Sequence, residues 1–188
     1  MARFAKSGMT LGVDQAAALT GVLTSGAQVE VLKAAAGTGK SFVVGAIADA
    51  WTRPAGTDNP DPEAEQGGRR VFGLAPYQVA IDVLAGEGLT AKNVPAWLAA
   101  QRRLDQHRAG TPSGGGPGGD DETWRLRRGD LVVVDEAGTA DTASLVEILA
   151  RCSAAGAKLL LVATPGSSRR SVRAVHCPTS LSTGSATS

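Results

Sequence analysis

The sequence predicts an α/β protein in which a parallel β-sheet is covered by helices on both faces. Two short runs, Leu131–Val134 and Lys158–Val162, are almost wholly apolar, as expected of strands that are buried on both faces. A third strand-like run, Val29–Leu32, leads directly into a glycine-rich turn and then a helix. Strands that alternate with helices in this way imply parallel pairing. With 188 residues, of which 43% are hydrophobic, the chain is long enough for one domain with a core.

The first half of the chain predicts three helices and two strands in alternation. Small and apolar residues favour the helices, and Gly, Ser or Pro residues separate the elements. Pro54 ends the second helix and Pro76 ends the second strand. In chain order we expect a helix at 13–23, a strand at 29–32, a helix at 41–51, a strand at 71–75 and a helix at 77–84.

The second half predicts two more helices around the two apolar strands. In chain order we expect a helix at 94–103, a strand at 131–134, a helix at 142–150 and a strand at 158–162. Stretches rich in Pro, Gly and acidic residues predict flexible insertions at about 53–69 and 108–123. The expected domain therefore spans residues 1–162, with a tail at 163–188.

Composition excludes several classes of protein. A formal net charge of +1 gives little long-range attraction for nucleic acid, so any DNA contact has to come from a local surface. The two cysteines, Cys152 and Cys177, are too few for a disulfide framework and lack metal-binding spacing. The chain has no leader-like N-terminus and no run approaching the ~18 apolar residues of a membrane span. We therefore expect a cytoplasmic protein with no membrane partner.

The glycine-rich turn predicts a nucleotide-phosphate loop. Gly37 and Gly39 let backbone N–H groups turn toward phosphates, and the helix that starts near Lys40 points its positive dipole end at them. Lys40 is expected to reach the β- and γ-phosphates, and the Ser41 hydroxyl to bind Mg²⁺. The pattern predicts a P-loop NTPase that binds ATP and Mg²⁺, although Ala34 stands where the pattern has its first glycine.

A pair of carboxylates follows the strand at 131–134. Ligands of open α/β sheets bind at the carboxyl ends of the strands, so Asp135 and Glu136 are expected to face the same pocket as the phosphate loop. Asp135 is placed to hold Mg²⁺, and Glu136 to orient and deprotonate the water that attacks the γ-phosphate. Asp130, before the strand, is expected to be a surface charge.

Four segments resemble motifs Q, I, Ia and II of superfamily 1 helicases: Gln15, Ala36–Ser41, Gly73–Gln78 and Val134–Ala137. Over residues 10–162 the chain is similar to the RecD-like helicase portion of MobF-class conjugative relaxases from high-GC bacteria. The resemblance implies that Gln15 contacts adenine and that Lys40 and Glu136 are catalytic. It also implies a nucleotide cradle made of Ala36, Gly37, Thr38, Gly39, Lys40 and Ser41.

The same resemblance implies a contact with single-stranded DNA. Pro76, Tyr77 and Gln78 correspond to a segment that lies along the DNA, and an aromatic ring just past a strand end suits base stacking. Thr90 is expected to touch the DNA backbone on the same surface.

The character of the chain changes after Val162. The resemblance implies a Gly-Asp-x-x-Gln-Leu segment there, whereas the chain reads Ala-Thr-Pro-Gly-Ser-Ser-Arg-Arg, and no acidic residue occurs from Ile148 to Ser188. When the residues from Ala163 onward are written in GC-rich codons with one G placed in front, the shifted frame begins Gly-Asp-Pro-Arg-Gln-Leu. We therefore expect 163–188 to be a frameshifted, disordered tail.

Motors of the resembled class hydrolyse ATP between two sheet domains, the second of which donates arginines to the transferring phosphoryl group. We expect this chain to lack both that second motor domain and the relaxase domain. The expected activity is ATP·Mg²⁺ binding with weak or no hydrolysis, and no DNA unwinding.

Two other functions remain open from the sequence. One is a small-molecule P-loop kinase, although the Gly/Pro-rich insertion carries few of the positive charges that a phosphate-covering lid needs. The other is a non-catalytic DNA- or partner-binding module. DNA-stimulated ATP turnover, a phosphorylated metabolite, or nucleotide-independent DNA binding would distinguish the three.

Overall fold

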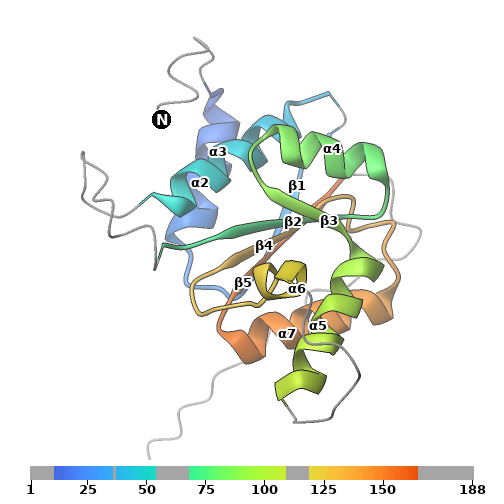
Figure 1. Ribbon diagram of the computed structural model, residues 1–188. Helices are drawn as coiled ribbons and strands as arrows, with labels where there is room; N and C mark the ends of the chain where they lie inside the picture. Colours follow the sequence, from blue (N-terminus) through green and yellow to red (C-terminus); the bar gives the residue numbers. More distant parts are fainter. Residues whose placement is uncertain (1–10, 36, 54–67, 109–118, 165–188) are drawn as a thin grey trace, which may run out of the picture.

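The computed structural model describes residues 11–35, 37–53, 68–108 and 119–164. They form one five-stranded sheet in the order β1-β5-β4-β2-β3, and every neighbouring pair of strands is parallel (Figure 1). The strands are β1 (Val29–Lys33), β2 (Val71–Ala75), β3 (Thr90–Asn93), β4 (Leu131–Val134) and β5 (Lys158–Ala163). The predicted α/β fold with a parallel sheet is confirmed.

Helices cover both faces of this sheet (Figure 1). One face is covered by α2 (Val13–Thr24), α3 (Lys40–Thr52) and α4 (Gln78–Gly86). The other is covered by α5 (Val94–Arg108), α6 (Gly119–Thr123) and α7 (Thr142–Ala155). Among the described residues, no helix combines the length and the apolar character needed to cross a bilayer.

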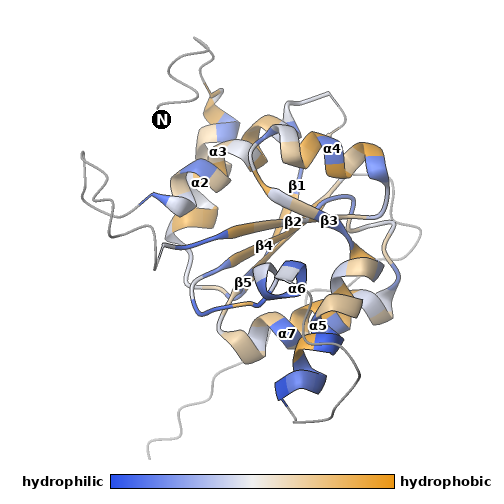
Figure 2. Ribbon diagram, in the orientation of Figure 1, coloured by the Kyte–Doolittle hydropathy of each residue, from blue (hydrophilic) through white to orange (hydrophobic). Residues whose placement is uncertain are grey.

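Strand β4 shows why an apolar run becomes a central strand. Leu131 and Val133 pack in the core on the α3 side, while Val132 and Val134 pack in the core on the α5 and α7 side. All four side chains are fully buried. Because successive side chains of a strand point to opposite faces, a strand buried on both sides needs apolar residues throughout. Figure 2 shows this as an orange centre to the sheet.

The structure adds two elements that the sequence did not predict. Strand β3 pairs with β2 at the edge of the sheet, although Thr-Ala-Lys-Asn is a polar run with little strand character. Helix α6 lies within the stretch expected to be a flexible insertion, where the buried carboxylate of Asp121 accepts two hydrogen bonds from Arg103 of α5, each 2.7 Å long.

Helices α5 and α7 run further than predicted, to Arg108 and Ala155. The core of each predicted insertion, residues 54–67 and 109–118, lies outside the described residues, as does the tail from 165 onward.

Asp130 is a buried structural residue and not the surface charge that the sequence suggested. Its side chain is nearly inaccessible and accepts hydrogen bonds from the Arg70 guanidinium, 2.5 Å at the shortest, and from the Arg127 N–H at 2.8 Å. These contacts fasten the start of β2 to the turn before β4. They therefore fix the two strands whose far ends carry the predicted DNA and catalytic residues.

Candidate functional site

The turn between β1 and α3 has the backbone geometry of a phosphate loop. Gly37 and Gly39 have φ values of +78° and +75°, a region that side chains other than glycine rarely adopt. Apart from its chain neighbours, no described residue has an atom within 4 Å of the position that a Cβ on Gly37 would take, so the space beside this glycine is open. Gly39 is the N-cap of α3, and Lys40 and Ser41 are the first two helical residues. The backbone N–H groups and dipole of the helix start thus lie beside an open space.

Ala36, the remaining residue of the predicted cradle, lies outside the described residues. The structure describes Thr38, whose side chain is exposed. Its N–H and its hydroxyl both donate to the Ala35 carbonyl, at 3.4 and 2.8 Å, which closes a tight turn in the middle of the loop.

Lys40 and Asp135 meet at the edge of the sheet where the carboxyl ends of the parallel strands lie. The Lys40 Nζ lies 3.3 Å from Asp135 Oδ1, and the two side chains are only 16% and 9% exposed. Strand β5 lies between β1 and β4 in the sheet, so this pair bridges across its carboxyl end. The phosphate loop and the predicted Mg²⁺ ligand therefore belong to one site.

The Lys40 Nζ also donates to Thr164 Oγ1, at 3.2 Å. Thr164 falls in the tail expected from the sequence, which predicts no role for it. Its position directly after a buried parallel strand was a usable signal, because such positions line the ligand-binding edge of a sheet.

Glu136 follows Asp135 in an unusual backbone conformation. Its φ is +50°, and within the described part of the chain it is the one non-glycine residue with a positive φ. The Glu136 N–H donates to Asp135 Oδ1 at 2.9 Å, and the Glu136 carbonyl accepts from the N–H and hydroxyl of Thr139. Strain of this kind is concentrated at functional sites, where the surrounding structure holds it in place.

Gln15 reaches the phosphate loop from α2. Its Nε2 donates to the Thr38 carbonyl at 2.9 Å, and its Oε1 accepts from the Gly12 N–H at 3.0 Å. A Cβ on Gly39 would lie 2.8 Å from this Nε2, so a side chain at position 39 would displace the end of the Gln15 side chain. A hollow of about 250 Å³ adjoins the contact, between the start of α2, the end of β1 and the loop. Gln15 thus lies beside both the phosphate loop and this hollow.

The predicted DNA-contacting residues divide between two places. Pro76, Tyr77 and Gln78 lie just past the carboxyl end of β2, and the Tyr77 side chain is 60% exposed. Gln78 donates to Asp82 on α4 at 2.8 Å. Thr90 instead begins β3 and pairs with Phe72, near the amino end of β2, so it does not share a surface with Tyr77.

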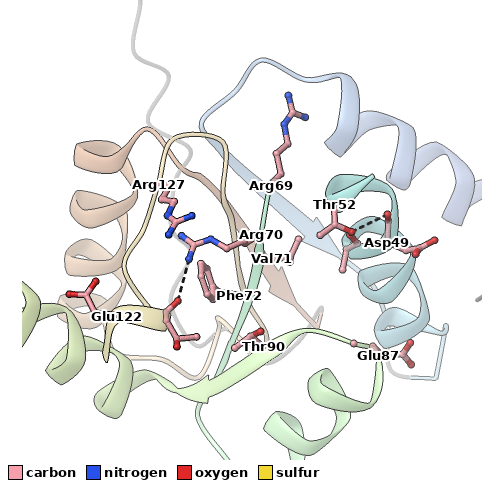
Figure 3. Close-up of a pocket in the computed structure, with 13 residues that line it drawn as sticks. Asp49, Thr52, Arg69, Arg70, Val71, Phe72, Glu87, Thr90, Glu122 and Arg127 are labelled. Atoms are coloured by element: carbon pink, nitrogen blue, oxygen red, sulfur yellow. Dashed lines mark hydrogen bonds between the residues drawn. The ribbon is translucent and has the colours of Figure 1, made fainter. Parts of the chain in front are cut away.

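Thr90 lines a hollow of about 410 Å³ at the amino ends of β2 and β3, opposite the phosphate loop (Figure 3). The Arg70 guanidinium lies over the Phe72 ring there, and Arg127 lies beside it, while Arg69 points away (Figure 3). Arg70 is already engaged by Asp130, and the Glu122 carboxylate by Arg125. This hollow is separate from the Lys40 and Asp135 site.

The residues present suit a triphosphate with Mg²⁺. The loop offers open space, a helix start and an ammonium group, which together are the donors that phosphate oxygens accept from. The Ser41 hydroxyl and the Asp135 carboxylate are oxygen ligands of the kind Mg²⁺ prefers. Among the described residues there is no cluster of three or more His, Cys, Asp or Glu side chains that could hold a metal. Few protein ligands are normal for Mg²⁺ that is bound together with phosphates.

In a comparison with protein families, residues 10–174 match the AAA domain. The chain belongs to the AAA domain family. This family is found in RecD-like helicases, and the chain therefore contains a P-loop nucleotide-binding module of the helicase type. P-loop domains of this family bind ATP, usually with Mg²⁺. A search of curated proteins gave no match.

Proposed function

We propose that this chain binds ATP·Mg²⁺ at the phosphate loop and corresponds to the first motor domain of the helicase portion of a conjugative relaxase. The observation that carries the proposal is the 3.3 Å contact between Lys40 and Asp135, which joins two segments far apart in the sequence. The Gln15, Gly73–Gln78 and Val134–Ala137 segments support it through their resemblance to motifs of superfamily 1 helicases.

Each residue then has a role that follows from its position. The loop amides and the Lys40 ammonium bind and orient the phosphates, and Ser41 and Asp135 would hold the metal ion. Bound Mg²⁺ would supply positive charge to the phosphate oxygens. Glu136, one residue beyond Asp135, orients a water molecule and accepts its proton, and Gln15 contacts the adenine base.

Turnover by this chain alone is expected to be low. The described residues form one sheet domain, whereas the resembled motors place ATP between two such domains. An arginine supplied by a second domain is typically worth about 10³–10⁵ in rate. We propose weak or no hydrolysis and no DNA unwinding by the chain on its own.

We also propose that Pro76, Tyr77 and Gln78 contact single-stranded DNA. The exposed ring of Tyr77, at a strand end on the phosphate-loop edge of the sheet, supports base stacking. Thr90 is excluded from this surface by its place on β3.

The frameshift remains a proposal about the gene. We propose that one nucleotide was lost or gained near the codon of Val162, which would explain the absence of acidic residues from Ile148 to Ser188. Sequencing the gene tests this directly. Family-like sequence in a shifted frame after that codon supports the proposal, and its absence from both alternative frames would end it.

The function is tested by measuring phosphate release from ATP with and without a single-stranded oligonucleotide. Slow release that the oligonucleotide accelerates is the expected result, and Tyr77→Ala should reduce the acceleration without changing basal release. Transfer of phosphate to a small molecule would favour a kinase. DNA binding that is indifferent to nucleotide would favour a non-catalytic module.

A further inference from the structure

The carboxyl end of β5 joins the two loops that make the site. The Val162 carbonyl accepts from the Ala137 N–H at 2.9 Å, beside Glu136. The next carbonyl, that of Ala163, accepts from the Ala34 N–H at 3.1 Å, at the start of the phosphate loop. The final residues of β5 therefore fix the loop after β1 and the loop after β4 relative to each other.

Thr164 is the next residue, and its hydroxyl lies at the same junction. The Lys40 Nζ is 3.2 Å from Thr164 Oγ1 and 3.3 Å from Asp135 Oδ1. A lysine ammonium has three donors, so these contacts use two of them and set where the charge sits. Because the Lys40 side chain is only 16% exposed, water cannot easily replace either partner.

We infer that Thr164 is a positioning residue of the proposed ATP site, with its hydroxyl holding the Lys40 ammonium where it meets the terminal phosphate. The inference rests on the ATP·Mg²⁺ site of the proposed function, and it concerns the chain as it stands, with Thr164 in place whatever the history of its reading frame. When Asp135 serves the metal ion, Thr164 is the partner that keeps Lys40 in place. A neutral hydroxyl suits this task, because it orients the ammonium without neutralising the charge that the phosphate needs.

The consequence is selectivity for a triphosphate over a diphosphate. Lys40 is expected to reach the β- and γ-phosphates, whereas the loop amides bind the phosphates that ATP and ADP have in common. Misplacing the ammonium should therefore weaken ATP binding more than ADP binding.

The test is calorimetric titration of the full chain with Mg·ATP and with Mg·ADP, for wild type and for Thr164→Val, Thr164→Ala and Thr164→Ser. Loss of the hydroxyl in the Val and Ala variants should weaken Mg·ATP binding by about threefold to tenfold, the range for one ordinary hydrogen bond, because Thr164 acts on the nucleotide only through Lys40. Mg·ADP binding should change by less than about twofold. Thr164→Ser should bind both nucleotides like wild type.

Thr52→Val is the matched control, because the Thr52 hydroxyl bonds to the Ala48 carbonyl at the far end of the same helix as Lys40. It should leave both affinities unchanged. Thermal melting of each variant shows whether it is folded, and the Ala variant carries the test if the Val variant is not. Unchanged affinities in the folded variants, or equal losses for ATP and ADP, would overturn the role of Thr164. Failure of the wild-type chain to bind Mg·ATP would instead overturn the proposed function, and this inference with it.

Discussion

Glu136 is the residue whose conformation is hardest to explain by stability alone. A non-glycine residue at positive φ costs on the order of 1–3 kcal/mol, and here the Asp135 side chain and Thr139 hold it in place. The strained turn directs the chain away from β4 immediately after the Asp135 carboxylate. Under the proposed function, this turn is what lets two consecutive acidic residues take different roles.

Glu136→Gln should leave nucleotide binding nearly unchanged while suppressing any hydrolysis, because an amide can accept a hydrogen bond from water but cannot take up its proton. The expected loss of turnover is about 10²–10⁴-fold, as far as the low basal rate of the wild type allows a loss to be measured. Single-turnover phosphate release, with ATP affinity measured in parallel, checks this prediction. Equal turnover in both proteins would remove Glu136 from the catalytic role.

The sequence predicts that the phosphate loop and Asp135 face one pocket, and the contact between Lys40 and Asp135 agrees with this, but most other contacts of these residues are not predictable from the sequence. Gly37, Gly39 and Lys40 follow from a loop pattern, and Asp135 follows from its place after an apolar strand. The contact of Thr164 with Lys40 could not be predicted, since it depends on β5 inserting between β1 and β4. The separation of Thr90 from Tyr77 likewise depends on the pairing of β3 with β2.

Helix α7 shows how a local signal fixes an element. Asp141 is its N-cap, and the carboxylate accepts from the Ser144 N–H at 2.8 Å. Hydrogen bonds from Ser144 hold the pKa of Asp141 below its usual 3.8. Gly156, with φ of +70°, ends the helix in the left-handed conformation that glycine favours. Both ends of α7 are thus encoded by residues next to it in the sequence.

Asp141→Ala should lower the melting temperature by about 2–4 °C, because it removes an N-cap. A carboxylate whose pKa is lower in the folded state stabilises the protein at pH values above 3.8, the pKa of Asp141 in the unfolded chain. That contribution is lost as the pH falls through the lower folded value. Melting curves of wild type, Asp141→Ala and Asp141→Asn between pH 7 and pH 3 test this. The asparagine variant keeps the cap without the charge, so wild type should approach it at the acidic end, and a constant difference across the range would contradict the assignment.

Elements without a local signal were missed. Strand β3 is polar because it lies at the edge of the sheet, and its pairing with β2 supplies the order that its sequence does not. Helix α6 lies in a region rich in glycine and acidic residues, and Asp121 joins it to Arg103 on the preceding helix, α5. The expectation of a surface charge at Asp130 was wrong for the same reason, since its partner Arg70 lies just before β2, far away in the sequence.

At the scale of the whole molecule, the strand that carries the phosphate loop is an edge strand. Within the described residues β1 pairs only with β5, and Val31 in its middle is 55% exposed. Unpaired edges with apolar side chains promote association between molecules. Glu30 and Lys33 give this edge some charge, and Glu30 is itself paired with Lys158 at 3.1 Å.

Val31→Lys should therefore reduce concentration-dependent association without loss of nucleotide binding, because the side chain lies on the edge strand and not in the phosphate loop. Sedimentation or light scattering across a range of protein concentrations measures the effect. Val79→Lys is the control, since Val79 is more exposed, at 76%, but lies on helix α4. If both substitutions act equally, general surface charge and not the β1 edge is responsible.

The central claim is that the loop around Gly37–Lys40 and the Asp135 carboxylate form one site for ATP·Mg²⁺. Equilibrium titration of the purified chain with a fluorescent ATP analogue, with and without Mg²⁺, tests it most directly when Lys40→Ala is compared with wild type. Arg108→Ala at the end of α5 serves as the charge-matched control. We predict Mg²⁺-dependent binding that Lys40→Ala weakens by about tenfold to a hundredfold, as for the loss of a charge-assisted contact, and that Arg108→Ala leaves unchanged. Binding that is absent, or that is equally strong in Lys40→Ala, would contradict the account.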